Sequence, residues 1–176
     1  CIPSKALLHV GRVVAEVREM QDWGVHFSAP KIDINAVRDR KEKVIDALTG
    51  GLAQLAKRRN VKVVQGQGMF TASNTLEVIQ QDAGSQKITF DHCILASGSR
   101  PARIPAFDIG SSRVMDSTGA LQLEDIPESL LVVGGGYIGL EMGTVYAELG
   151  SRVSVVELTD SLLPGADRDL VKPLHK

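Results

Sequence analysis

The stretch Leu130-Leu131-Val132-Val133-Gly134-Gly135-Gly136-Tyr137-Ile138-Gly139 decides the fold of this chain. Its first four residues form an apolar run typical of a strand buried in a parallel sheet, and we expect a strand there. The glycines favour a tight turn into a helix that ends near Leu149, with Gly150 closing it. A second strand is expected over Arg152–Glu157. Strand, turn, helix and strand in this order form a βαβ unit, which is typical of doubly wound α/β proteins.

The glycine spacing in this unit is that of a dinucleotide-binding turn. Gly134 would permit the turn, Gly136 would let the backbone approach a pyrophosphate, and Gly139 would let the helix pack close to the strand. Glu157 ends the second strand, where it can accept hydrogen bonds from the adenosine ribose. Because no basic residue follows before Arg168 to hold a 2′-phosphate, the pattern favours NAD over NADP. A glycine turn without a ligand is the alternative. The predicted contacts are Gly134, Gly135, Gly136, Tyr137, Ile138, Gly139 and Glu157.

Two helices and several short strands are expected before this unit. Apolar residues at three- and four-residue spacing predict one helix that ends at Trp23-Gly24 and a second from about Asn35, its expected cap, to Lys57. Gly50-Gly51 inside the second helix indicates either a close contact or a break. A turn is expected at Asp82-Ala83-Gly84-Ser85. The expected strands are Val61–Val64, Leu76–Gln80, Lys87–Phe90 and Cys93–Ala96.

The composition excludes several classes of partner. The 176 residues are 43% hydrophobic and 23% charged, with a formal net charge of -1, as in an ordinary globular protein. This balance gives no reason to expect nucleic acid or an anionic membrane, and no apolar stretch reaches the roughly 20 residues that span a bilayer. With two cysteines, a reducing cytoplasm is the expected compartment. Cys93 lies in an apolar run and is expected to be a buried thiol. No metal site is expected.

The opening residues Cys1-Ile2-Pro3-Ser4-Lys5 resemble the second half of the redox-active motif of the pyridine nucleotide–disulfide oxidoreductases. Further stretches resemble that family in the same order and spacing, so the likeness covers essentially the whole chain. They are Gln65-Gly66-Gln67-Gly68, Ile94–Pro101, Ser117–Leu121 and Gly134–Glu141. Pro3-Ser4-Lys5 is most similar to the bacterial dihydrolipoamide dehydrogenases, because glutathione and thioredoxin reductases usually carry Pro-Lys-Lys there. Mercuric reductases share Pro-Ser-Lys and stay as the alternative, although their usual NADP preference fits Glu157 poorly.

The resemblance implies two domains and an activity. It implies a partial Rossmann-like FAD-binding domain over residues 1–126 and the first part of a second Rossmann-like domain, for NAD, over residues 127–176. It implies an enzyme that oxidises dihydrolipoamide to lipoamide through a cysteine pair and FAD, with NAD as electron acceptor. The implied partners are a lipoyl domain on an acyltransferase subunit of a 2-oxo acid dehydrogenase complex and a second copy of the protein.

The resemblance also assigns roles to single residues. Cys1 matches the thiol next to the flavin, although without the motif it would be an incidental terminal thiol. A cysteine at the start of a helix lies at the positive end of the helix dipole, which favours the thiolate, and Pro3 suits the first helical turn. Lys5 matches a lysine near the flavin, and Glu141 matches the acid paired with it; as a bare pattern, Glu141 is a helix-surface acid. Backbone contacts to FAD are matched by Gly68, Ser97, Gly98 and Ser99. Tyr137 matches a residue that can cover the nicotinamide pocket or simply pack.

Several family features do not occur in these residues. They are the upstream partner cysteine, the first FAD-binding glycine fingerprint and the dimerisation domain with its His-Glu base. No motif resembling this base surrounds any histidine, and we expect all four, His9, His26, His92 and His175, to be structural or exposed. We therefore expect an internal piece of a longer enzyme that is inactive by itself. A non-catalytic nucleotide-binding module is the alternative from a different class.

Overall fold

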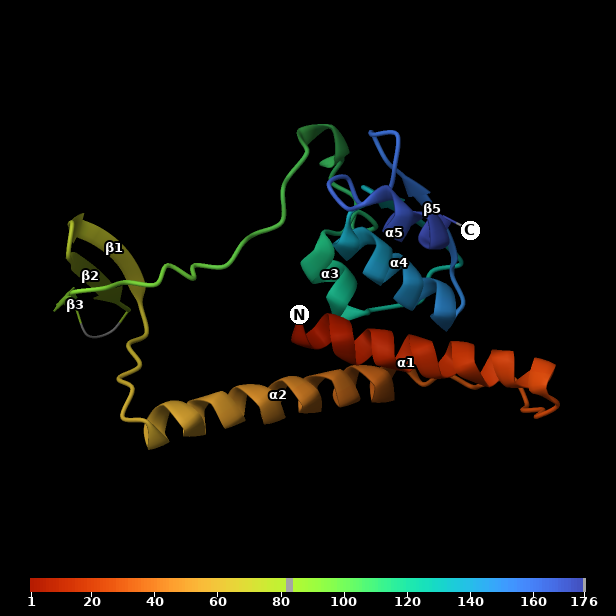
Figure 1. Cartoon of the computed structure of the whole chain (residues 1–176), viewed down its shortest axis with the longest axis horizontal. Helices are drawn as coiled ribbons and strands as arrows, with labels where there is room; N and C mark the ends of the chain where they lie inside the picture. Colours follow the sequence, from red (N-terminus) through yellow and green to blue (C-terminus); the bar gives the residue numbers. More distant parts are fainter. Residues whose placement is uncertain (82–83, 176) are drawn as a thin grey trace. The chain divides into compact units, whose positions relative to one another are not determined.

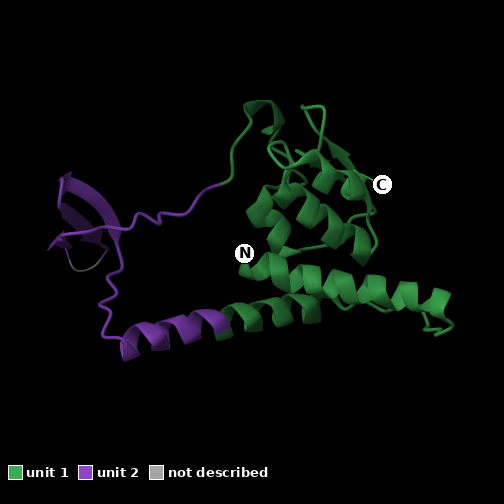
Figure 2. Cartoon of the chain, viewed as in Figure 1, with its two compact units in different colours: residues 1–47, 101–176 green, residues 48–100 purple. Residues whose placement is uncertain are grey.

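The computed structural model describes residues 1–81 and 84–175, and the chain forms two compact units. Residues 1–47 and 101–176 make up the first unit, and residues 48–100 make up the second (Figure 2). The chain contains both helices and strands, and they alternate near its end, in the strand–helix–strand segment over residues 129–156 (Figure 1). The predicted domain boundary between residues 126 and 127 lies inside the first unit and stays a prediction.

The first helix forms as predicted. α1 (Ile2–Glu19) begins directly after Cys1, with a proline in its first turn. A short 3-10 helix, η1 (Met20–Trp23), extends it, and Gly24 ends it with a φ of 84°. A glycine suits that position because a positive φ would bring a Cβ against the backbone, and glycine has no Cβ.

The second helix, α2 (Ile34–Arg58), runs from the first unit into the second. Its cap is Asp33, whose Oδ1 accepts hydrogen bonds from the N–H groups of Asn35 at 3.0 Å and Ala36 at 3.1 Å. The prediction that Asn35 is the cap is wrong, because a capping side chain must precede the N–H groups that it accepts. Gly50-Gly51 neither breaks the helix nor marks a close contact, since a Cβ at either position would meet open space.

The predicted βαβ unit is confirmed. β4 (Ser129–Val133) and β5 (Arg152–Val156) pair in parallel, from Ser129 opposite Arg152 to Val133 opposite Val156. α4 (Tyr137–Leu149) connects them and ends at Gly150, whose φ is 121°. A Cβ at Gly143 would lie 3.4 Å from the Val153 side chain, so α4 packs closely on this pair of strands.

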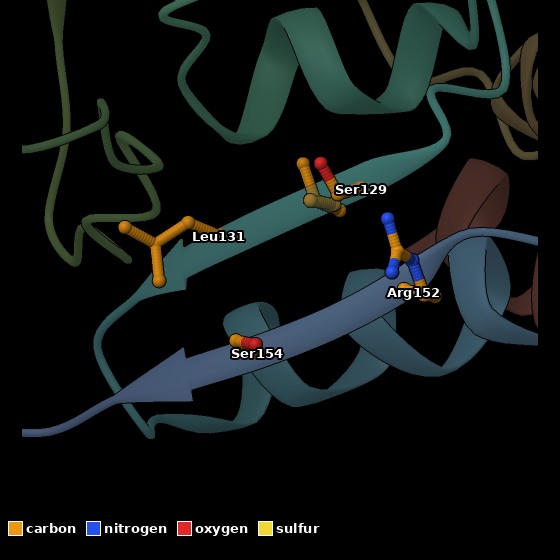
Figure 3. Close-up of a pocket in the computed structure, with 5 residues that line it drawn as sticks. Ser129, Leu131, Arg152 and Ser154 are labelled. Atoms are coloured by element: carbon orange, nitrogen blue, oxygen red, sulfur yellow. The ribbon is translucent and has the colours of Figure 1, made fainter.

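The other face of the β4–β5 pair is open. Leu131 is 60% exposed and Val133 is 51% exposed. The prediction that this strand is buried on both faces is therefore wrong, because α4 covers only one of them. A surface pocket on the strand pair is lined by Ser129, Leu130, Leu131, Arg152 and Ser154 (Figure 3).

The core of the first unit joins three helices. α3 (Ser117–Gln122) and α1 both pack against α4. The remaining short helices of this unit are η2 (Pro105–Phe107), α5 (Arg168–Val171) and η3 (Lys172–His175). The buried cluster consists of Leu7, Ala120, Leu123, Met142, Val145, Tyr146 and Leu149.

The second unit contains an antiparallel sheet in the order β1-β2-β3. Its strands are β1 (Gln67–Ala72), β2 (Thr75–Gln80) and β3 (Gly84–Thr89). The predicted strands at Leu76–Gln80 and Lys87–Phe90 thus match β2 and β3. β1 was not predicted, and Gly84 and Ser85 of the predicted turn lie in β3. Asp82 and Ala83, the other two turn residues, lie outside the described residues.

Two predicted strands do not form among the described residues. Residues 61–64 and 93–96 have no strand partner there, so their apolar side chains stay accessible: Val63 is 66% exposed and Ile94 is 93% exposed. Cys93 is an exposed free thiol, and the prediction of a buried one is wrong for the same reason. Across the described ranges, no helix has the length and apolar character required to cross a bilayer.

Candidate functional site

The helix that begins at the cysteine packs directly on the helix that follows the glycine turn. Lys5 Nζ on α1 donates to Glu141 Oε1 on α4, which forms the predicted ion pair. A second ion pair joins Arg18 to Glu148 near the C-terminal ends of the two helices. On α1, Gly11 lies between Lys5 and Arg18, and a Cβ there would lie 3.3 Å from the Glu148 Cβ, so the helices approach closely. These contacts show that α1 and α4 run in the same direction, as Figure 1 shows.

Cys1 lies at the N-terminal end of α1. Its side chain is an exposed free thiol, and its carbonyl oxygen accepts the Lys5 N–H at 3.0 Å to open the helix. Lys5 lies in the first turn of α1, next to the thiol, and its ion pair with Glu141 joins this turn to the beginning of α4. This arrangement is possible because α1 and α4 run in the same direction. The site therefore combines a thiol, a cation and an acid at one end of a helix pair.

The glycine turn has the geometry that a dinucleotide would need. Gly134 has a φ of 108°, and its N–H donates to the Val156 carbonyl at 2.8 Å. A Cβ on Gly139 would lie 2.5 Å from the Gly134 carbonyl oxygen, which confirms the predicted close packing of helix on strand. A Cβ on Gly136 would meet nothing within 4 Å. The backbone at Gly136 is therefore accessible at the N-terminus of α4, where helix N–H groups favour a phosphate.

Glu157 closes this turn from the end of β5. Its Oε2 accepts the Gly135 N–H at 2.6 Å, and its Oε1 accepts the N–H of Thr159 at 2.8 Å and the Thr159 hydroxyl at 2.9 Å. These hydrogen bonds, led by the one from the Thr159 N–H, lower the pKa of Glu157. The carboxylate is thus held ionised beside the glycine turn, as recognition of ribose hydroxyls requires.

The loop after Glu157 also contacts the glycine turn. The Leu163 N–H donates to the Gly135 carbonyl at 2.8 Å, and a Cβ on Gly135 would lie 2.7 Å from Leu162 Cδ2. Sequence reasoning missed this loop and the two donors of Thr159. The only sign in the sequence is a threonine two positions after Glu157. Hydrogen bonds between residues so close in the chain follow no characteristic spacing, so they are hard to predict.

The remaining predicted residues fall into two groups. Tyr137 is 68% exposed and Ile138 is 45% exposed, both at the start of α4. The predicted FAD contacts all lie in the second unit: Gly68 is in β1, and residues 97–99 form an exposed segment. Gly98 has a φ of 72° with open space around it, which suits close approach of the backbone to a ligand. All four histidines are exposed, as expected. None of the predicted site residues lines the pocket of Figure 3.

The whole chain, residues 1–176, matches the family described as pyridine nucleotide-disulphide oxidoreductase. The chain belongs to this family. Its oxidoreductase relatives include proteins named dihydrolipoyl dehydrogenase. The relative from Vibrio parahaemolyticus is 52% identical over 176 residues, which are 100% of this chain and 37% of that protein. The relative from Vibrio cholerae is 53% identical and the one from Haloferax volcanii is 42% identical. Each match again covers 100% of this chain and 37% of the relative. The chain thus spans about 37% of the length of these curated relatives.

Solved structures of oxidoreductases agree with the fold. LpdA from Mycobacterium tuberculosis is similar with a TM-score of 0.79 and 25% identity, over 99% of this chain and 38% of that one. The HOCl-induced flavoprotein disulfide reductase RclA from Escherichia coli is similar with a TM-score of 0.74 and 29% identity, over 99% of this chain and 36% of that one. The α/β class of the fold, with its Rossmann-like βαβ unit, is therefore shared with flavoprotein disulfide reductases.

Proposed function

We propose that the full-length protein oxidises dihydrolipoamide to lipoamide, with a cysteine pair that includes Cys1, bound FAD, and NAD as electron acceptor. The observation that carries this proposal is the Lys5–Glu141 ion pair, which joins the thiol helix to the dinucleotide helix at their N-terminal turns. The names of the relatives from both Vibrio species support the choice of dihydrolipoamide as substrate.

The residues of the chain fit NAD well. The open backbone at Gly136 and the N-terminus of α4 would hold the pyrophosphate, and Glu157 would accept hydrogen bonds from the adenosine ribose. The ionised carboxylate would repel a 2′-phosphate, so we expect preference for NAD over NADP. Tyr137 and Ile138, the first two residues of α4, would lie beside the bound NAD.

For FAD, the proposal rests on the resemblance and on the left-handed, open backbone at Gly98. Gly68, Ser97, Gly98 and Ser99 would contact FAD through their backbone groups. Bound FAD would supply the two-electron relay between thiol and nicotinamide. The chain's own part is to hold Cys1 at the positive end of α1, and to keep the Lys5 ammonium and the Glu141 carboxylate together beside it.

The visible absorption spectrum of the full-length protein tests the proposal. A bound-flavin spectrum that develops a long-wavelength charge-transfer band on reduction by dihydrolipoamide, and loses this band in Cys1→Ser, supports it. Bound flavin that reacts with NADH but ignores dihydrolipoamide would assign the protein to another disulfide reductase. The likeness to RclA favours this second candidate class, of which mercuric reductase is one example. A protein without flavin would leave only a non-catalytic nucleotide-binding module.

We further propose the setting in which the full-length protein acts. It would be a cytoplasmic homodimer that reoxidises the lipoyl domain of an acyltransferase subunit in a 2-oxo acid dehydrogenase complex. The low cysteine content, two in 176 residues, fits a reducing compartment. Size-exclusion chromatography, with and without a purified lipoyl domain, tests the dimer and its partner. Elution as a monomer would contradict the dimer.

A further inference from the structure

Thr159 directs two hydrogen-bond donors at one oxygen of the Glu157 carboxylate. Its backbone N–H lies 2.8 Å from Oε1, and its hydroxyl oxygen lies 2.9 Å from the same atom. The other carboxylate oxygen, Oε2, accepts the Gly135 N–H at 2.6 Å. Three donors therefore already occupy the group that the ribose of NAD would use.

The capacity of a carboxylate decides what must happen when the ribose binds. Each oxygen has about two lone-pair positions, or about four for the whole group. On Glu157, both positions of Oε1 are filled, and one position of Oε2 accepts no hydrogen bond of normal geometry and is open. The Leu158 N–H adds only a weak contact to the carboxylate. An adenosine ribose presents two adjacent hydroxyls. One of them can use the open position, but the second can donate only if a present donor leaves.

The Thr159 hydroxyl is the donor that can leave. The N–H groups of Gly135 and Thr159 are fixed by the backbone, and the Gly135 carbonyl accepts the Leu163 N–H at 2.8 Å, which further anchors this residue. The hydroxyl carries one rotatable proton, and its oxygen also lies 3.0 Å from the Ser161 carbonyl oxygen. It can therefore change acceptor without being left unpaired, and an unpaired donor would be the costly outcome.

We infer that the Thr159 hydroxyl occupies a ribose position on Glu157 in the nucleotide-free protein and transfers its hydrogen bond to the Ser161 carbonyl when NAD binds. Thr159 is thus a positioning residue that sets the affinity for the ribose. This inference rests on the proposed NAD site. The transfer replaces a bond to a charged acceptor with a bond to a neutral one, so it opposes binding of any ligand that uses both hydroxyls. A ligand that uses one hydroxyl takes the open position on Oε2 and avoids this opposition.

Calorimetric titration of the full-length protein tests the inference with two ligands, NAD and an NAD analogue whose adenosine ribose lacks the 2′-hydroxyl. In Thr159→Val, which keeps the backbone N–H, the Kd for NAD should fall about threefold, because no charged hydrogen bond has to be exchanged for a neutral one. The Kd for the analogue should not change. Thr159→Ser keeps a hydroxyl and should match the unaltered protein with both ligands.

Thr144→Val is the matched control, because its hydroxyl bonds the Leu140 carbonyl at 2.8 Å within α4 and does not reach Glu157. It should leave both Kd values unchanged. The inference is overturned if Thr159→Val weakens NAD binding, leaves it unchanged, or shifts both ligands by the same factor. Failure of the proposed function would give a different result. The unaltered protein would not bind NAD, or Glu157→Gln would bind NAD as tightly as the unaltered protein does. Either result would rule out both the proposed NAD site and the role of Thr159.

Discussion

Lys41 Nζ donates a hydrogen bond to the Leu121 carbonyl, 2.8 Å away, at the C-terminal end of α3. The Tyr146 hydroxyl donates to the neighbouring Ala120 carbonyl at 3.0 Å. α2 thus supplies a donor to a carbonyl at the end of α3. The Ala120 carbonyl also accepts the Leu123 N–H at 3.2 Å, so the Tyr146 hydroxyl on α4 is its second donor. Lys41 is 3% exposed and its other partner is the Glu42 carboxylate at 2.9 Å, so its charge is compensated.

Lys41→Met should destabilise the full-length protein. The Leu121 carbonyl would lose a charged donor in a buried place, which costs about 1.5–3 kcal/mol. Urea unfolding followed by circular dichroism should show a lower midpoint at unchanged slope. Lys43→Met on the same helix is the control, because Lys43 is exposed. Equal effects of the two substitutions would contradict a specific role for Lys41.

Gly136→Ala and Gly139→Ala should separate binding from folding. At Gly136 a methyl group enters open space, so stability should be kept while NAD affinity falls about tenfold, because the methyl occupies the approach to the phosphate. At Gly139 the methyl would lie 2.5 Å from a backbone oxygen, so unfolding should occur several degrees lower. Thermal unfolding and NAD titration measure the two effects. A Gly136→Ala protein with unaltered NAD affinity would refute the phosphate assignment.

Glu157→Gln should change how stability depends on pH. The lowered pKa of Glu157 means that its hydrogen bonds contribute fully above the ordinary value of 4.5, and that the contribution is lost as the pH falls through the lowered pKa. The unaltered protein should therefore be more stable than Glu157→Gln at neutral pH, and the gap should close in acid. Denaturation at a series of pH values measures this gap. Glu19→Gln, at an exposed site, is the comparison, and a gap that widened in acid would contradict the prediction.

Glu141→Gln should affect activity more than stability. The Lys5 side chain is 63% exposed, so the ion pair should contribute less than about 1 kcal/mol to folding. Reduction of the flavin by NADH should slow on the order of tenfold, because no carboxylate would hold the Lys5 ammonium in place beside the reacting groups. Stopped-flow absorbance measures that rate. The ion pair of Arg18 and Glu148 offers the control: Arg18→Gln, farther along α1, should leave the rate unchanged. A normal rate in Glu141→Gln would exclude the proposed role.

The βαβ unit could be predicted from sequence because every requirement of it is local. An apolar strand, a glycine turn at Gly134 and a helix closed by Gly150 each carry their own signal, and the structure has all of them. The close contact of Gly139 with Gly134 followed from the same spacing. The Lys5–Glu141 pair is different, since 136 positions separate its members and only the family resemblance brought them together.

The second unit was harder to predict because a strand depends on its partner. Residues 61–64 and 93–96 are apolar enough for strands, but they have no partner among the described residues. β1 was missed because its glycine was interpreted as a cofactor contact, although Ser73-Asn74 links it to β2 as a tight hairpin turn. Lys41 and Thr159 escaped prediction for another reason: a single polar side chain that bonds a backbone group leaves no pattern in the sequence.

The packing of α1 on α4 also has a consequence for how the protein is made. α1 is synthesised before α4, and α4 is complete only after Leu149 has been added. At about 5–20 residues per second, the 136 positions between Lys5 and Glu141 take roughly 7–27 s to translate. During that time Leu7, which is 1% exposed in the folded unit, has no native partner on α4. The nascent chain should therefore be a substrate for ribosome-associated chaperones until α4 emerges.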